Sequence, residues 1–147
     1  MRRLLFIVWA LVTAMCLGSC GFVKQSEMTG LPLDSFVLEI TVQGKGVYGV
    51  HIEYLIGGEP MGGRFMGYAD NSEIRKGEVF HDEYLKGDFK EGSDISEMEI
   101  FVFAVTEDQS ELSAGEKIPV KAALNTKQAL ILSGDPEQGF TAQLTDR

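Results

Sequence analysis

The chain has 147 residues, with 13 Lys or Arg against 22 Asp or Glu, and a formal net charge of −9 at pH 7. A chain this acidic offers no basic patch to offset phosphates, so we expect no nucleic-acid partner. Anionic lipid headgroups would repel it as well. Its two cysteines are Cys16 and Cys20. The remainder of the chain can therefore hold no disulfide, thiol nucleophile or cysteine metal ligand.

The first residues have the pattern of a secretory signal. Arg2 and Arg3 form a short basic region, and residues 4–17 then run without a charge. An apolar run of this length, behind basic residues and before small ones, is typical of a cleaved signal peptide. A permanent spanning helix needs about 20 apolar residues. Residues 4–17 are therefore too short to be a lasting membrane anchor.

The sequence Leu17-Gly18-Ser19-Cys20 resembles the lipobox of bacterial lipoproteins, in which leucine and two small residues precede a cysteine. The resemblance implies that Cys20 receives a diacylglycerol on its sulfur and that cleavage falls between Ser19 and Cys20. The expected location is the extracytoplasmic face of the cell membrane or the outer membrane. Each buried CH₂ contributes about 0.8 kcal/mol, and two or more acyl chains anchor a protein stably.

Removal of residues 1–19 would leave 128 residues with a net charge of −11, since both basic residues of the signal leave with it. This length suits one domain with a real core. Residues 20–34 show no sustained period and contain glycine and proline, so we expect a flexible tether behind the lipid. The alternative is a freely secreted protein in which Cys20 is incidental.

From Ser35 onward the hydrophobic period is two, the period of a half-buried β-strand. The first two strands are expected to pair as a hairpin. The apolar run in 97–106 indicates a central strand covered on both faces. The glycine-rich segment 57–63 is expected to be a loop, and among the loops it is a fair place for binding. The predicted strands are 35–42, 47–56, 64–69, 78–85, 97–106, 118–124, 127–132 and 139–144.

About seven to eight short strands, with turns at regular spacing and no helical pattern, predict an all-β fold. We expect a single β-sandwich over residues 35–147, either immunoglobulin-like or transthyretin-like. The order in which the strands pair cannot be read from one sequence.

Few residues of this domain could carry catalysis. His51 and Glu53 share one face of their strand, as a general base and an orienting carboxylate would. No motif places a nucleophile beside them. His81 and Glu83 also share a face, because neighbouring residues of a strand point to opposite sides. We expect surface or structural roles for these side chains, and no enzyme.

Thioethers and imidazoles together suit copper. His51, Met61, Met66 and His81 loosely resemble the His/Met pattern of periplasmic copper-chaperone domains, which implies metal binding or delivery. The spacings differ, and Glu83 stands where that family has a methionine. Packing in a loop and in the core also accounts for the two methionines.

Two functions follow from the sequence. The first is a membrane-anchored lipoprotein of the bacterial cell envelope, whose sandwich is a non-enzymatic binding module for an envelope protein or a glycan. It needs no cofactor beyond the lipid on Cys20. The alternative is copper-type metal binding or delivery by His51 and His81 with methionine or carboxylate partners. Imidazoles lying close together would favour the metal function, and separated, solvated ones the binding module.

Overall fold

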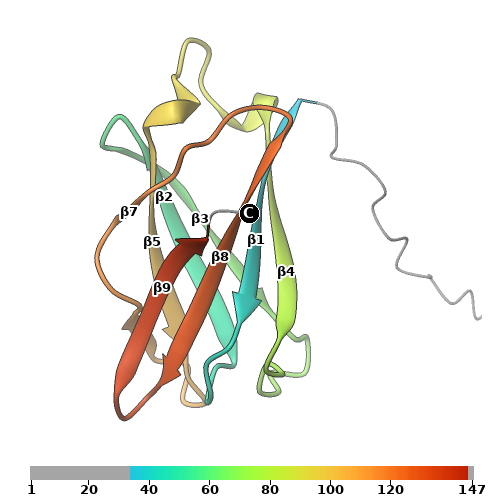
Figure 1. Ribbon diagram of the computed structural model, residues 1–147, viewed down its shortest axis with the longest axis vertical. Helices are drawn as coiled ribbons and strands as arrows, with labels where there is room; N and C mark the ends of the chain where they lie inside the picture. Colours follow the sequence, from blue (N-terminus) through green and yellow to red (C-terminus); the bar gives the residue numbers. More distant parts are fainter. Residues whose placement is uncertain (1–33, 146–147) are drawn as a thin grey trace, which may run out of the picture.

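The computed structural model describes residues 34–145, which form two β-sheets packed face to face (Figure 1). The predicted all-β sandwich is confirmed. Sheet A has the order β4–β1–β8–β9, and sheet B the order β3–β2–β5–β6, with β7 also paired to β5. The bounds are β1 Ser35–Val42, β2 Gly49–Ile56, β3 Glu59–Gly67, β4 Glu78–Leu85, β5 Met98–Val105, β6 Glu111–Ser113, β7 Ile118–Pro119, β8 Thr126–Asp135 and β9 Gly139–Thr145.

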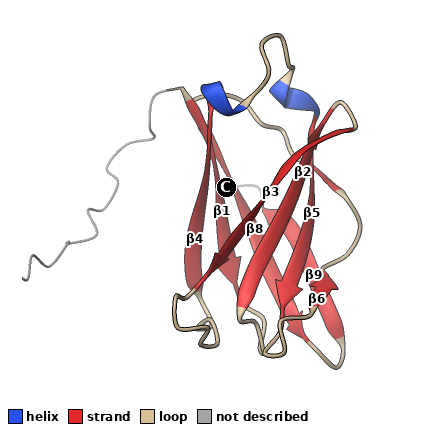
Figure 2. Cartoon of the chain, turned by 180° about the vertical axis from the view of Figure 1, so that it is seen from behind, coloured by secondary structure: helices blue, strands red, loops and turns tan. Residues whose placement is uncertain are grey.

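Two one-turn 3₁₀-helices, η1 Lys86–Asp88 and η2 Ile95–Glu97, lie between β4 and β5. Both sit at one end of the sandwich (Figure 2). No helix within residues 34–145 is long and apolar enough to cross a bilayer. The predicted signal peptide, the lipidated Cys20 and the tether up to residue 33 lie outside the described residues.

β1 lies in the middle of sheet A and follows the predicted alternation. It runs antiparallel to β4 and parallel to β8. Each inward side chain of this strand stabilises the fold by about 1.5–3 kcal/mol through burial. The fully buried apolar side chains of β1 are Phe36, Leu38, Ile40 and Val42, and sheet B packs Val50, Ile52, Ile100 and Val102 into the same core.

The expected hairpin between the first two strands is wrong. β1 belongs to sheet A and β2 to sheet B, so their connection crosses between the sheets. The backbone N–H groups of Gln43 and Gly44 both donate to the Leu132 carbonyl of β8, at 2.7 and 3.1 Å. Val47 is then completely buried. These contacts lead the chain across the end of the sandwich instead of back along β1.

The segment expected to be a glycine-rich loop is mostly strand, because β3 already begins at Glu59. Gly57 and Gly58 have φ angles of 58° and 81°, the left-handed pair that a two-residue hairpin turn requires. β2 and β3 therefore form the tight hairpin. Gly63 stays inside the strand, where the imidazole of His51 occupies the space that a side chain would need.

β5 is central in sheet B, between β2 on one side and β6 and β7 on the other. The prediction that both its faces are covered is wrong, since Phe101 and Phe103 on the outer face are only half-buried. β7 is a two-residue edge pairing, as the missing N–H of Pro119 predicts. The predicted hairpin of the last two strands is confirmed as β8 and β9.

A half-buried ion pair joins the edge strands β3 and β4 across the two sheets, with Asp82 buried and Arg64 partly exposed. Arg64 Nε lies 3.3 Å from Asp82 Oδ1, and Arg64 Nη2 lies 2.9 Å from Asp88 Oδ2. The guanidinium carbon lies 4.9 Å from the centre of the Tyr84 ring, a cation–π contact. Burial raises the pKa of Asp82 above its usual range, while the Tyr84 hydroxyl and then the Arg64 guanidinium work in the opposite direction. Arg64 is the cation that lies beside this buried carboxylate.

Replacing Arg64 with methionine should lower the free energy of unfolding by about 3 kcal/mol, because Asp82 is left buried without its cation. This is the low end of the usual range, since Arg64 is 36% exposed. Urea unfolding at neutral pH measures the loss. Lys127→Met is the control, because it breaks an ion pair whose lysine is 53% exposed and should cost under about 1 kcal/mol. Equal losses in the two variants would contradict the prediction.

Candidate functional site

The outer face of sheet B carries a row of rings across three strands. Phe65 of β3 lies opposite His51 of β2 in register, and Phe103 of β5 lies opposite His51 on the other side. The His51 and Phe103 ring centres are 5.7 Å apart, with 30° between the planes. Phe65 is 56% exposed. We call Phe65, His51 and Phe103 the aromatic row.

Three glycines let two of these rings lie directly on the backbone. A Cβ on Gly49 would come within 2.5 Å of the Phe65 ring, and a Cβ on Gly67 within 3.2 Å. A Cβ on Gly63 would lie 2.7 Å from His51 Nε2. A side chain at Gly49 or Gly63 would therefore force the Phe65 ring or the His51 imidazole to move. A side chain at Gly67 would tighten the contact with the Phe65 ring.

Carboxylates surround the aromatic row. Glu111 Oε1 lies 3.0 Å from His51 Nδ1, although without the alignment of a hydrogen bond. Glu53 is exposed and lies two residues from His51 on the same face of β2. Lys117 Nζ lies 2.8 Å from Glu99 Oε2 and offsets that charge. This face therefore combines partly exposed rings with an excess of negative charge.

His51 and Glu53 share a face, as predicted, but the carboxylate that contacts the imidazole is Glu111 of β6. Ser113 is the next residue across the sheet from Phe103. Its hydroxyl donates to the Gly115 carbonyl at 2.8 Å. The arrangement thus supplies an apolar surface with charged neighbours, and it does not supply a nucleophile aligned with a base.

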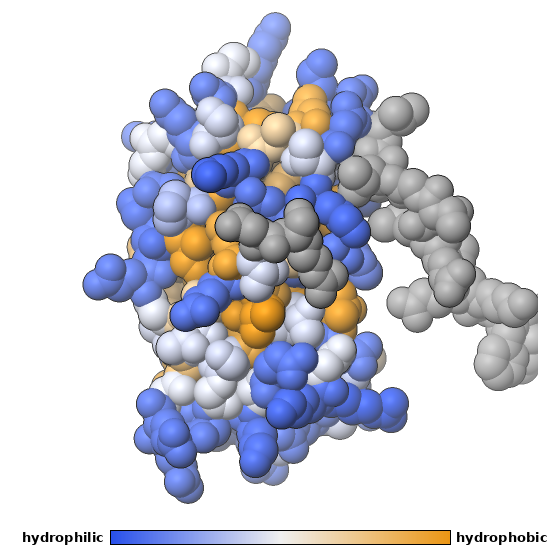
Figure 3. Space-filling model, in the orientation of Figure 1, coloured by the Kyte–Doolittle hydropathy of each residue, from blue (hydrophilic) through white to orange (hydrophobic). Residues whose placement is uncertain are grey.

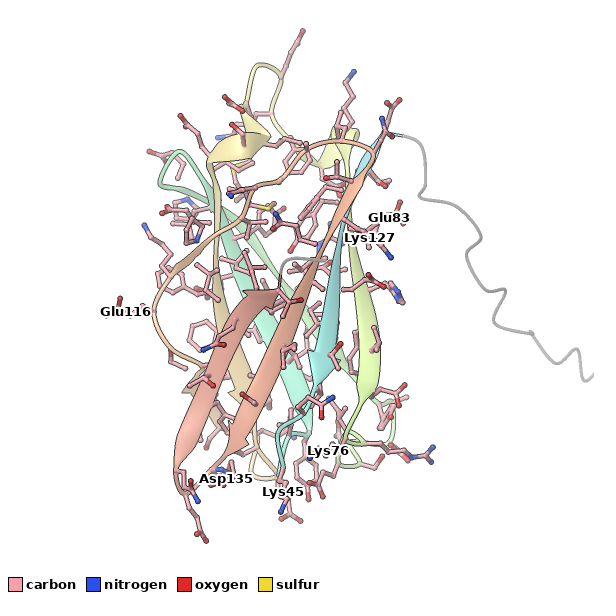
Figure 4. All side chains as sticks on the ribbon, viewed as in Figure 1. Lys45, Lys76, Glu83, Glu116, Lys127 and Asp135 are labelled. Atoms are coloured by element: carbon pink, nitrogen blue, oxygen red, sulfur yellow. The ribbon has the colours of Figure 1, made fainter. Side chains whose placement is uncertain are left out.

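His81 lies on the outer face of the opposite sheet. Its Nε2 lies 3.3 Å from Glu39 Oε1, and Lys127 Nζ lies 3.0 Å from Glu39 Oε2. The hydrogen bond from Lys127 is the main cause that lowers the pKa of Glu39. Glu83 also lies on this face, and Val37 of β1 separates it from Lys127 in the register (Figure 4). Figure 3 shows the same side of the molecule, where apolar patches lie among polar side chains.

The predicted metal set is not brought together. His51 and His81 lie on the outer faces of opposite sheets, so the two imidazoles cannot ligate one ion within a chain. Met61 and Met66 pack against the hydrophobic core. In the part of the chain that the structure describes, no three His, Cys, Asp or Glu side chains form a group that could hold a metal ion.

No protein-family model matches the chain, and no curated protein matches it. Among solved structures, the chain is similar to one described as a Gram-negative toxin, with 12% identity and a TM-score of 0.40. A second, described as a trapped toxin, has 13% identity and a TM-score of 0.33. The alignments cover 77% and 78% of this chain but 23% and 24% of those chains. Neither likeness supports a conclusion about what this chain does.

The aromatic row was not predicted from the sequence. One signal was present in Gly63, Phe65 and Gly67, which lie on one face of a strand. The two glycines have no side chains, so they leave space on either side of the aromatic ring. Their strand was expected to begin only at residue 64, so the pattern was split between a loop and a strand. Gly49 and Phe103 come from two further strands, and only the pairing register brings them to Phe65.

Gly49→Ala should displace the Phe65 ring and lower the free energy of unfolding by about 1–3 kcal/mol, the usual cost of overpacking. Denaturant unfolding measures the loss, and the NMR shifts of the Phe65 ring protons report its displacement. Gly87→Ala is the matched control, because nothing lies within 4 Å of a Cβ at that glycine. In a Phe65→Ala background, Gly49→Ala should cost little unfolding free energy, because the ring that it would clash with is absent. An equal cost of Gly49→Ala with and without the ring would contradict the contact.

The stability of sheet A should depend on the ionisation of Glu39. Its pKa is lowered in the folded state, so the pairing stabilises the fold above the unfolded pKa of about 4.3. This stabilisation is lost as the pH falls through the lower, folded value. Glu39→Gln should therefore flatten the fall in unfolding free energy between about pH 5 and pH 3. Lys127→Met should flatten it similarly, and an unchanged slope in both variants would contradict the assignment.

Proposed function

We propose that this chain is a lipid-anchored binding module of a bacterial cell envelope. Cys20 carries the lipid, and the outer face of sheet B engages a partner without catalysing a reaction. The observation that supports this function is the aromatic row, in which Phe65 is 56% exposed on a rigid sheet. No cofactor beyond the covalent lipid is required.

The exposed ring is the main physical reason for a binding function. Contiguous exposed apolar surface favours association, and the centres of protein interfaces are enriched in aromatic residues with polar groups around them. The outer face of sheet B has this composition, since Phe65, Phe101 and Phe103 share it with the carboxylates of Glu53 and Glu111. The surface is a β-sheet, so docking would require little ordering of the protein.

The positions of the histidines give no support to metal delivery. His51 approaches Glu111 on one sheet, and His81 approaches Glu39 on the other. Each imidazole thus has one carboxylate neighbour, whereas a protein metal site usually has three or four ligands. The binding module is the function that the geometry supports best.

Site-specific crosslinking in intact cells tests the proposal. A photoreactive benzoylphenylalanine in place of Phe65 should give one discrete adduct, while the same group in place of Val79 should not. Val79 is a suitable control because it is 42% exposed on the outer face of sheet A. Cys20→Ala should move the protein out of the membrane fraction and weaken the adduct. The proposal fails when both positions give the same products or neither gives any.

A further inference from the structure

We propose that the outer face of sheet B binds a polypeptide partner through arginine. The guanidinium stacks on the exposed side of the Phe65 ring and pairs with the carboxylate of Glu111. This inference rests on the proposed binding function and names the chemistry of the partner.

The ring provides the first part of such a site. Phe65 lies on the backbone of Gly49 and Gly67, which fixes one side of the ring. More than half of the side chain remains exposed. A cation over an aromatic face is attracted by the ring quadrupole, and the planar guanidinium of arginine makes this contact more often than the ammonium of lysine.

A carboxylate provides the second part. The Phe65 ring leans toward Gly49 and Gly67, and this row of the sheet continues through Val105 to Glu111. Glu111 Oε1 lies 3.0 Å from His51 Nδ1, and His51 lies beside Phe65 in register. The Glu111 carboxylate therefore reaches back across the sheet toward the ring. A guanidinium above Phe65 would have this carboxylate on one side.

The edge of the sandwich between β3 and β4 already contains such an arrangement. Arg64, 36% exposed, stacks over the ring of Tyr84 at 4.9 Å and pairs with the carboxylates of Asp82 and Asp88. The outer face of sheet B supplies a ring and a carboxylate, and an arginine from a partner would add the cation.

Charge decides between the possible occupants. Glu53, Glu99 and Glu111 place three carboxylates on this face. Among the described residues, Lys117 is the only lysine or arginine that forms an ion pair there. Complementary charge raises the association rate and suppresses partners of like charge. An anionic glycan or a second copy of this acidic chain would be repelled. A neutral sugar would donate hydroxyl hydrogen bonds to the carboxylates, but it would gain no long-range attraction from the net charge.

The test uses the full lipidated chain in micelles of an uncharged detergent. The probe is the capped peptide Gly-Arg-Gly-Arg-Gly, compared with peptides in which lysine or the neutral citrulline replaces arginine. Chitopentaose serves as a neutral sugar. NMR titration at low and high salt gives each dissociation constant. We expect the arginine peptide to bind most tightly, the lysine peptide about 2–5-fold more weakly, and neither citrulline nor the sugar to saturate. High salt should weaken the arginine peptide.

Variants locate the contact. Phe65→Leu keeps an apolar side chain but removes the ring, and Glu111→Gln removes a charge. Each should weaken the arginine peptide about 2–5-fold, and Val79→Ala on sheet A should not. Equal binding of the arginine and citrulline peptides, saturation by the sugar, or unchanged affinity in Phe65→Leu would overturn the inference. Self-association that covers Phe65 would also overturn it.

The two proposals fail in different ways. A discrete adduct at position 65 in cells, together with no preference for arginine in the titrations, would leave the binding face in place and overturn only its assigned partner. Absence of a position-dependent adduct would remove the proposed function itself.

Discussion

The parallel pairing of β1 with β8 is the constraint on which the rest of this fold depends. It places β1 between β8 and β4, so both edges of that strand are used over Phe36–Val42. β2 then has no place beside β1, and the chain must cross to the other sheet. There β2 pairs with β3 and β5. The aromatic row is assembled across these three strands, so its existence follows indirectly from how β1 is paired.

The same topology explains why Arg64 lies where it does. β3 and β4 are the edge strands of the two sheets on one side of the sandwich. The ion pair of Arg64 with Asp82 joins the two strands at that edge. A buried ion pair adds little net stability compared with apolar packing, but it penalises arrangements that leave either charge alone. Arg64 and Asp82 thus help to fix which edges face each other.

Alternation along the chain was sufficient to predict the inner faces of β1, β2 and β9, because a period of two requires no knowledge of the neighbours. It could not give the pairing of β1 with β8, since their residues are far apart in sequence and register is a property of two strands. The predicted loop over residues 57–63 was wrong for the same reason, because the sequence does not show what lies beside these glycines in the sheet. Gly63 disfavours a strand by itself, but the imidazole of His51 occupies the space beside it. The candidate site was therefore unpredictable, except for His51 and Glu53.

The glycines on the outer face of sheet B are difficult to explain by stability alone. Glycine within a strand costs backbone entropy and gives up a side chain for packing. Gly49, Gly63 and Gly67 accept that cost on a face where Phe65 remains largely exposed, so burial of the ring does not recover it. In return, the glycines let the Phe65 ring and the His51 imidazole lie closely on the backbone, which holds both in place. An interface formed by immobilised side chains loses less conformational entropy when a partner docks. The glycines are therefore better explained by the affinity of this surface for a partner than by the stability of the isolated domain.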